Sequence, residues 1–468
     1  MSEPIPLNAA PPQHQVRLPL AQVLALAGDC QQAGRQDHAV SLLDAALKAA
    51  PRDPDALHLA DIAAYYSGEL AQAADHIGRA TTERPLSAVY FRDLCSIYER
   101  LGRYEEAVAA GERALQLDPF DALALHNLSV VNQRLLRLDA AIGYARRAVR
   151  MDPHSAKPHL GLAELLLLQG AMEEGFEEYE WRFRVPEAGP LLPQTDRPQW
   201  DGQPITDGTL LLIADQGFGD VLQFVRYLPW AASRCADLVL ACAPELHRLI
   251  RHNYSGIATF ECWNKCPPFA VYCPLSGLPR LHGTRPETIP AAIPYLLPEP
   301  AATKAWAERL RIMLPRNHRR VGIVWSGRAH PPGRSTSLAA LAPLAAIEGV
   351  SLVSLQMGDA QAEVGDYFGD APLLHLGHEL ADFSDTAAVL ANLDLLVTID
   401  TAVAHLAGAL GKPVWVMLPY SPDWRWLLDR ADSPWYPTAR LFRQPAPRRW
   451  EFVVAEVAAA LHDAVRQS

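Results

Sequence analysis

The sequence has no long hydrophobic run, no basic stretch and no cysteine pattern typical of a disulfide framework. No segment of about 18 apolar residues occurs, which predicts a chain without a membrane span. The opening residues, MSEPIPLNAAPPQHQ, lack the charged-then-apolar order of a secretory signal. A net charge of −11 disfavours nucleic-acid binding, which needs clustered Lys and Arg. Seven cysteines, an odd number in a long chain, favour reduced thiols and a cytoplasmic protein.

The first part of the chain does contain a repeat of 34 residues. Prolines, alanines and glycines recur at this spacing: Pro51, Pro85, Pro119 and Pro153; Ala46, Ala80, Ala114 and Ala148; Ala39, Ala73, Ala107 and Ala141; Gly34, Gly68, Gly102 and Gly170, with Leu136 in the remaining glycine position. Glycine suits a turn between helices, alanine lets helices approach closely, and proline ends the second helix. The period predicts about five helix-turn-helix units over residues 17–186, and it resembles the tetratricopeptide repeat.

Such an array forms a superhelix with a concave face, which suits capture of a peptide or protein segment. The alternative is a rigid spacer or a dimerisation surface, so the sequence is also compatible with a homo-oligomer. Asp53-Pro54-Asp55 has the Asp-x-Asp pattern of metal-dependent sugar transferases. Because the Asp-Pro pair recurs in later repeat turns, we interpret it as turn chemistry instead.

A proline-rich stretch, residues 187–204, separates this array from sequence of a different texture. Prolines at this density end helices and favour extended chain. After the stretch, continuous apolar strands alternate with helices over residues 205–300 and again over 301–468. This alternation predicts two parallel sheets, each buried between helices. Ligands of such Rossmann-like sheets bind at the carboxyl ends of the strands, so we expect the cleft between the halves to hold the site.

The first predicted half begins with the segment LLLIADQGFGDVLQFVRYLPW, residues 210–230, in which a strand gives way to a helix. Gly217 and Gly219 permit close backbone approach at this turn, and Asp220 starts the helix. The plain structural interpretation is a tight turn in which Asp220 caps the helix. The pattern alone is weak, and it gains weight from a matching turn in the second half.

The matching turn lies in LVTIDTAVAHLAGALGKPVWV, where a strand over residues 395–399 ends at Asp400. Small residues, Thr401 and Ala402, leave the first-turn N–H groups of the next helix accessible, and His405 follows one turn later. Such N–H groups, together with the helix dipole, bind anions. The alternative is simple packing, with Asp400 as the helix cap.

These two segments, GFGDVLQFVRYLP and TIDTAVAHLAGALGKPVWV, resemble the heptosyltransferase-type glycosyltransferases. The whole chain is similar to bacterial tetratricopeptide-glycosyltransferase proteins, and its architecture to the protein O-linked N-acetylglucosamine transferases. The resemblance implies a fold of the GT-B type, with two facing Rossmann-like domains. It also implies an inverting, metal-independent glycosyltransferase that needs no cofactor and moves a sugar from a nucleotide-sugar to a protein or glycan acceptor.

The resemblance also implies roles for individual residues. It makes Asp220 the general base on the acceptor hydroxyl and Arg334 a cation near the phosphates. The residues that would cradle the donor diphosphate are Gly217, Gly219, Asp400, Thr401, Ala402 and His405. Elementary chemistry agrees, because helix N–H groups and a guanidinium can stabilise a leaving diphosphate and a carboxylate can accept a proton. The chain departs from the group in a shorter loop before Arg334 and in Ala270, where an Asp is common.

Three further features stay open between function and packing. Gln356, at the end of a predicted strand, is interpreted as facing the nucleotide or as capping the strand. The segment Asp423-Trp424-Arg425 is interpreted as a wall of the sugar pocket or as a packed loop. The spacing of Cys262, Cys266 and Cys273 fits no common zinc site, so we predict no metal.

Two other functions compete with the transferase. One is a non-catalytic scaffold with a degenerate glycosyltransferase region, which the short loop before Arg334 favours. The other is a nucleotide-sugar epimerase, a small-molecule task that a repeat array disfavours.

Overall fold

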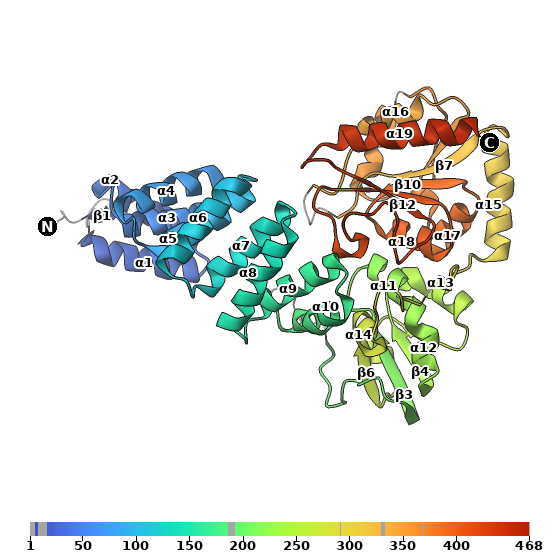
Figure 1. The fold of residues 1–468 in the computed structure, drawn as a ribbon, viewed down its shortest axis with the longest axis horizontal. Coiled ribbons are helices and arrows are strands. Elements are labelled where there is room, and N and C mark those ends of the chain that lie inside the picture. Colours follow the sequence, from blue (N-terminus) through green and yellow to red (C-terminus); the bar gives the residue numbers. More distant parts are fainter. Residues whose placement is uncertain are drawn as a thin grey trace. The chain divides into compact units, whose positions relative to one another are not determined.

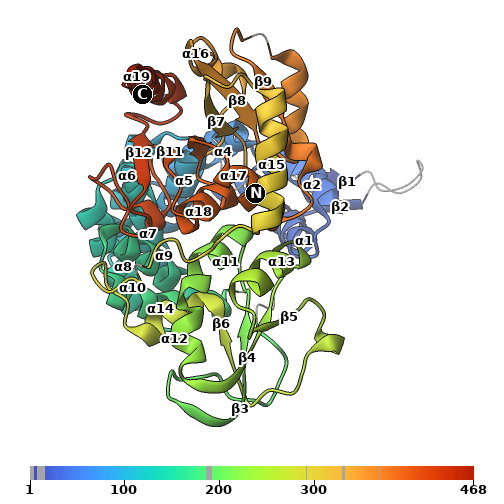
Figure 2. The same cartoon turned by 90° about the vertical axis from the view of Figure 1, so that its right-hand side faces the viewer.

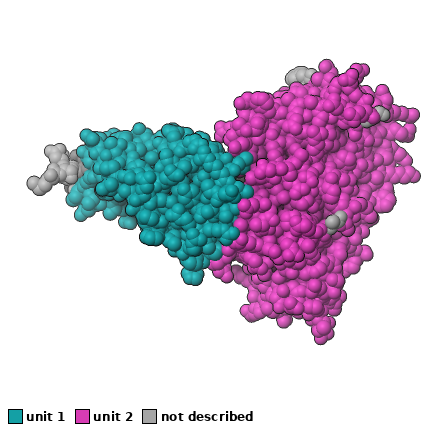
Figure 3. Space-filling model, in the orientation of Figure 1, with its two compact units in different colours: residues 1–165 teal, residues 166–468 magenta. Residues whose placement is uncertain are grey.

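The computed structural model describes residues 5–7, 16–185, 192–290, 292–328, 333–367 and 369–467. The chain divides into two compact units, residues 1–165 and 166–468 (Figure 3). The division falls ahead of the predicted linker, residues 187–204, of which residues 187–191 lie outside the described chain. None of the helices among the described residues is long and apolar enough to cross a membrane.

The first unit is an array of paired helices (Figure 1). A short antiparallel pair of strands, β1 (Ile5–Leu7) and β2 (Val16–Leu18), precedes it. The pairs are α1 (Leu20–Gln32) with α2 (Gln36–Ala49), α3 (Pro54–Tyr66) with α4 (Leu70–Glu83), α5 (Ala88–Arg100) with α6 (Tyr104–Leu117), and α7 (Ala122–Arg134) with α8 (Leu138–Met151). A fifth pair, α9 (Ala156–Gln169) with α10 (Met172–Tyr179), continues from the first unit into the second. The predicted helical repeats are therefore confirmed.

The repeated residues have the structural roles that the period predicted. The four alanines Ala39, Ala73, Ala107 and Ala141 are fully buried. The turn glycines have positive φ, from 72° at Gly34 to 92° at Gly170, and Leu136 occupies the same left-handed region with φ 55°. A non-glycine residue there costs about 1–2 kcal/mol. Asp53 caps α3, because its Oδ1 accepts a 2.9 Å bond from the amide of Ala56, which supports turn chemistry for the Asp-Pro-Asp segment.

Polar contacts at a constant sequence separation join neighbouring repeats. The His58 Nε2 atom lies 2.9 Å from an Asp93 oxygen, and Arg134 Nε donates to Glu99 over 3.0 Å; both pairs are 35 residues apart. These side chains therefore join the second repeat to the third and the third to the fourth, in addition to the apolar core.

Asp61 breaks the pattern of small residues at its position in the array. The corresponding residues in the other repeats are Ala27, Cys95, Ser129 and Ala163. Asp61 is 2% exposed, and its Oδ2 atom has no hydrogen-bond partner among the described residues. Burial raises the pKa of Asp61 to about 8, and the nearby Asp93 carboxylate adds to the rise. The folded array thus retains a proton that the unfolded chain releases near its usual pKa, so stability falls as pH rises from about 4 to about 8.

We predict that Asp61→Ala stabilises the array, by a margin that grows over this pH range to a few kcal/mol. Urea unfolding at pH 5 and pH 8 measures the difference. Asp75→Ala is the matched control, because the Asp75 side chain is 66% exposed and should change stability by at most about 0.5 kcal/mol. A destabilised Asp61→Ala protein, or one with the pH slope of the parent, would contradict the prediction.

The second unit contains two parallel sheets with helices packed on them (Figure 1). The first has the order β5-β4-β3-β6. Its strands are β3 (Ile205–Ile213), β4 (Cys235–Ala241), β5 (Ala258–Phe260) and β6 (Val271–Pro274), and its helices are α11 (Phe218–Phe224), α12 (Leu228–Ala232), α13 (Pro244–Asn253) and α14 (Leu278–His282). The connection from β5 to β6 contains only the short 3-10 turn Trp263–Lys265.

The second sheet has the order β12-β11-β10-β7-β8-β9, with every pair parallel. Its strands are β7 (Arg319–Val324), β8 (Val350–Ser354), β9 (Leu373–His375), β10 (Leu395–Ile399), β11 (Val414–Leu418) and β12 (Ala439–Arg443). Its helices are α15 (Pro300–Met313), α16 (Ala342–Ala345), α17 (Phe383–Ala391), α18 (Ala402–Ala409) and α19 (Trp450–Arg466). In chain order this is the 3-2-1-4-5-6 arrangement of doubly wound sheets, whose switch point lies between β7 and β10.

The two halves of this unit meet along helices from both sheets. The helix pairs α11 with α18 and α13 with α17 lie side by side, as Figures 1 and 2 both show. Arg226, only 4% exposed, donates two bonds of 3.1 and 3.0 Å to the Trp435 carbonyl of the other half. Because a buried guanidinium is costly unless it is hydrogen-bonded, this contact fixes the halves against each other.

Candidate functional site

The two turns predicted from the sequence, Gly217–Asp220 at the start of α11 and Asp400–Ala402 at the start of α18, lie against each other in the second unit. A Cβ atom on Gly219 would lie 2.8 Å from Cδ2 of His405 and 3.6 Å from Cα of Ala402. Only a residue without a side chain permits this separation between α11 and α18. The close approach predicted for Gly219 therefore exists, and it is an approach to the facing helix.

Asp220 uses both of its carboxylate oxygens. Its Oδ2 atom accepts a 3.0 Å bond from the amide of Gly217, which caps α11, and its Oδ1 atom pairs with Arg425 of the other half. The side chain keeps 21% of its surface exposed. Burial raises the pKa of Asp220, Arg425 opposes the rise, and the carboxylates of Asp423 and Asp215 add to it. The carboxyl thus has the capping role of the plain interpretation, and it is also a solvent-accessible candidate base.

Arg425 is the partner that sequence reasoning did not connect to Asp220. It is 8% exposed, donates to Asp423 and to Gln223 over 2.8 Å each, and lies 4.1 Å from the centre of the Trp424 ring. The interpretation of residues 423–425 as a packed loop is supported. This loop nevertheless reaches the candidate base, from a position 205 residues away in the chain.

His405 is a packed, neutral ring. Burial lowers the pKa of His405 to about 3, and the positive charge of Arg425 lowers it further. Its Nδ1 atom lies 2.9 Å from the Tyr436 hydroxyl, and its ring stacks on Trp426 at 5.4 Å. A ring held in this way cannot move aside for a larger residue at position 219.

Asp400 and Thr401 lie at the carboxyl end of β10, where the sequence predicted an anion site. Burial raises the pKa of Asp400 to about 6, the Asp423 carboxylate adds to the rise, and Arg425 and Arg334 oppose it. Thr401 is the cap residue of α18, but its side chain makes no capping bond; its Oγ1 atom lies 3.1 Å from that of Thr398. The first-turn N–H groups of α18 are consequently left without that cap.

Two arginines follow β7 and lie beside the two turns. A Cβ atom on Gly327 would lie 3.5 Å from both Nη2 of Arg334 and Cγ2 of Thr401, which places Arg334 at the start of α18. Arg328 lies near Gly217, whose added Cβ would be 3.5 Å from Nη1. The Nε atom of Arg334 is buried without a hydrogen-bond partner among the described residues. Residues 329–332, including His330, lie outside the described chain.

Gln356 faces the loop after β7. Its Oε1 atom accepts from the amides of Trp325 and Ser326 at 3.0 and 2.9 Å, and its Nε2 atom donates to the carbonyls of Ser326 and Met357 at 3.1 and 2.8 Å. These bonds use the whole amide. The strand-end interpretation therefore fits the structure, and Gln356 holds the loop that leads to the arginines.

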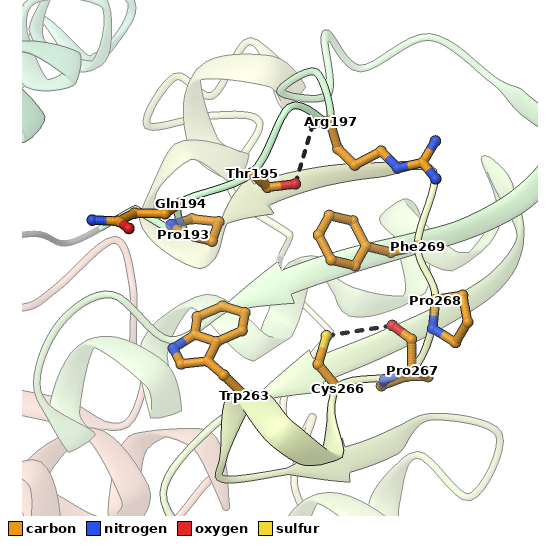
Figure 4. Close-up of a pocket in the computed structure, with 9 residues that line it drawn as sticks. All are labelled: Pro193, Gln194, Thr195, Arg197, Trp263, Cys266, Pro267, Pro268 and Phe269. Carbon is orange, nitrogen blue, oxygen red and sulfur yellow. Dashed lines mark hydrogen bonds between the residues drawn. The ribbon is translucent and has the colours of Figure 1, made fainter.

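A separate hollow of about 380 Å³ lies on the first half of this unit (Figure 4). Residues 193–197 and 263–269 line it, with the aromatic rings of Trp263 and Phe269. It shares no residue with the two turns. Among the described residues, no group of three or more His, Cys, Asp or Glu side chains is arranged to hold a metal ion.

Comparisons with known proteins agree with the repeat array. A tetratricopeptide repeat model matches residues 62–122 and 133–182. Protein FlbA of Caulobacter vibrioides is 29% identical over 334 residues, which cover 64% of this chain and 54% of FlbA. The chain thus spans about half the length of that relative. Because 64% of the chain exceeds the first unit, the similarity includes part of the second.

Two solved structures that resemble the chain each cover about a third of it. MamA from Desulfovibrio magneticus RS-1 is 18% identical with a TM-score of 0.33, over 36% of this chain and 96% of MamA. TTC0263, a TPR protein of Thermus thermophilus, is 23% identical with a TM-score of 0.32, over 36% of this chain and 93% of that protein.

We predict that Gly219→Ala destabilises the second unit by about 1–3 kcal/mol, because the new methyl group overlaps the fixed ring of His405. This cost outweighs the gain in helix propensity, about 1 kcal/mol at most. Thermal unfolding measures the effect. Gly256→Ala is the matched control, because a Cβ there meets nothing within 4 Å. Equal unfolding temperatures for the two variants would show that the helices do not meet as described.

Proposed function

We propose that this protein is a glycosyltransferase of the GT-B type, which moves a sugar from a nucleotide-sugar to a protein or glycan acceptor held by the repeat array. The observation that supports the proposal most is the meeting of the two turns. It brings a carboxylate, Asp220, to the same place as the uncapped start of α18 and two arginines. These are the groups that a sugar transfer without a metal ion requires.

The proposed reaction is a single displacement at the anomeric carbon. The acceptor oxygen forms a bond to this carbon while the bond between the carbon and the diphosphate breaks. The electron pair of the breaking bond goes to the phosphate oxygen. The N–H groups at Thr401 and Ala402, with Arg334 and Arg328, stabilise the charge that develops there. The acceptor proton passes to Asp220. Attack opposite the leaving group inverts the sugar configuration.

A second candidate function is a non-catalytic scaffold, and one observation favours it. Both oxygens of Asp220 already have partners, Gly217 and Arg425, as expected for a purely structural carboxylate. Calorimetry with UDP, GDP, ADP and CDP separates the two functions. The transferase binds at least one nucleoside diphosphate, whereas a degenerate scaffold binds none.

We predict that Asp220→Asn lowers transfer about 10²–10⁴-fold while nucleoside diphosphate affinity stays within a few-fold. The assay incubates the protein and a lysate of candidate acceptors with labelled nucleotide-sugars, and calorimetry follows binding. Asp432→Asn is the matched control, because the Asp432 side chain is 65% exposed and pairs with neighbouring Arg430. The proposed transferase activity would be refuted if the wild-type protein neither transferred sugar from any common nucleotide-sugar donor nor hydrolysed one.

We predict that Arg425→Gln moves the acid limb of the pH-rate profile to higher pH. A base acts only when ionised, so activity falls as pH drops through the pKa of Asp220. Burial already raises this pKa and Arg425 opposes the rise, so removing its charge should raise the limb by about 1–3 pH units. Arg425→Lys should restore part of the shift. Arg430→Gln serves as the control, and an unmoved limb in Arg425→Gln would exclude Asp220 as the titrating base.

A further inference from the structure

The end of the repeat array belongs to the same compact unit as the candidate site. The second stretch matched by the tetratricopeptide model ends at residue 182, whereas the second unit begins at Leu166. Helix α10 and the 3-10 turn Glu180–Arg184 that follows it therefore pack with the sheets.

Arg182 anchors the strand end from which the Gly217–Asp220 turn departs. Its Nε and Nη2 atoms lie 3.4 and 3.5 Å from Oδ2 of Asp215, and the two side chains are 5% and 1% exposed. Ser276, which follows β6, donates its amide to Oδ1 of Asp215 over 3.1 Å and its hydroxyl to Oδ2. A buried carboxylate needs such partners, so the position of Asp215 depends on the arginine and the serine.

The guanidinium of Arg182 is itself fixed within its own turn. Its Nη1 atom donates to the Tyr179 carbonyl over 2.8 Å and to Glu180 over 3.1 Å, and the group lies 3.8 Å from the centre of the Phe183 ring. These contacts leave little freedom for the side chain. Asp215 is thus held by a rigid group, not by a flexible surface arginine.

Tyr179 makes a second link from α10 to the turn. The Gln216 Nε2 atom donates to the Tyr179 hydroxyl over 2.9 Å, so the two residues just before the Gly217–Asp220 turn are both held from the last repeat. The rings of Tyr179 and Phe176 also meet Trp424 edge to face, at 6.1 and 5.7 Å. Trp424 is the ring on which Arg425 lies.

We propose that Arg182 is a positioning residue: by fixing Asp215, the last repeat holds the Gly217–Asp220 turn in the geometry that the reaction uses. The catalytic consequence rests on the proposed function, but the positioning itself does not. A donor cradle at Thr401 lies on the other sheet, so loss of Arg182 should affect the rate of transfer and not donor binding.

Hydrogen exchange of the full chain tests the positioning without any substrate. We predict that Arg182→Gln accelerates exchange of the amides of residues 215–222 by about tenfold, while strand Leu395–Ile399 is unchanged. Arg182→Lys keeps the charge, so its exchange rates at residues 215–222 should lie between those of the wild-type protein and Arg182→Gln. It also provides a second variant in case Arg182→Gln fails to fold. Arg184→Gln is the matched control, because Arg184 is exposed on the same turn and contacts Trp181.

Unchanged exchange at residues 215–222 would overturn the proposal, and so would equal acceleration of the turn and of β10. In a protein that transfers sugar, Arg182→Gln should also lower kcat about tenfold with the donor KM within about twofold. A raised donor KM at constant kcat would contradict positioning of the base. If the wild-type protein transfers nothing, the proposed function fails while the exchange result still decides the role of Arg182.

Discussion

The second unit depends on one constraint: two helix starts from different sheets must approach closely while a buried charge between them stays paired. Gly219 makes the approach possible, because any side chain there would overlap His405. The buried guanidinium of Arg425 is compensated at this contact, because it pairs with both Asp220 and Asp423. The sheets on each side are doubly wound layers, and this contact joins them together with the α13–α17 packing and the Arg226–Trp435 hydrogen bonds.

This constraint explains why the candidate site is rich in interactions between its own side chains and backbone. Gln356 uses its whole amide on the loop after β7, and His405 is held between Tyr436 and Trp426. In the proposed transferase, residues of this kind would hold the charged groups in place before a substrate binds. Among the described residues, the groups of the site without a full set of partners are the start of α18, the Nε atom of Arg334 and the exposed part of Asp220.

Much of this architecture could be predicted from the sequence, because it follows from the spacing of residues that are close together in the chain. The 34-residue period predicted the helical pairs, and even the exceptional Leu136 keeps the backbone of the glycines it replaces. Alternating apolar strands predicted the parallel sheets, and the glycines at positions 217 and 219 predicted a close approach of the backbone. Pairings between distant side chains could not be predicted. Arg425 and Asp220 are 205 residues apart, and nothing near either residue indicates the other. Gln356 is a similar case, because a strand-end glutamine looks the same whether it faces a ligand or a loop.

The boundary between array and sheets shows the same limit in another form. Composition changes at the proline-rich stretch after residue 185, but packing changes earlier, inside α9. A sequence indicates where helices end, whereas a compact unit is defined by which side chains pack together. Arg182 belongs to the second unit in this sense, because its charge is buried against Asp215. The last repeat is thus a repeat by its period and a part of the sheet domain by its contacts. Residues 166–184 therefore continue the 34-residue period of the array and, through Arg182 and Tyr179, also support the residues that lead into the Gly217–Asp220 turn.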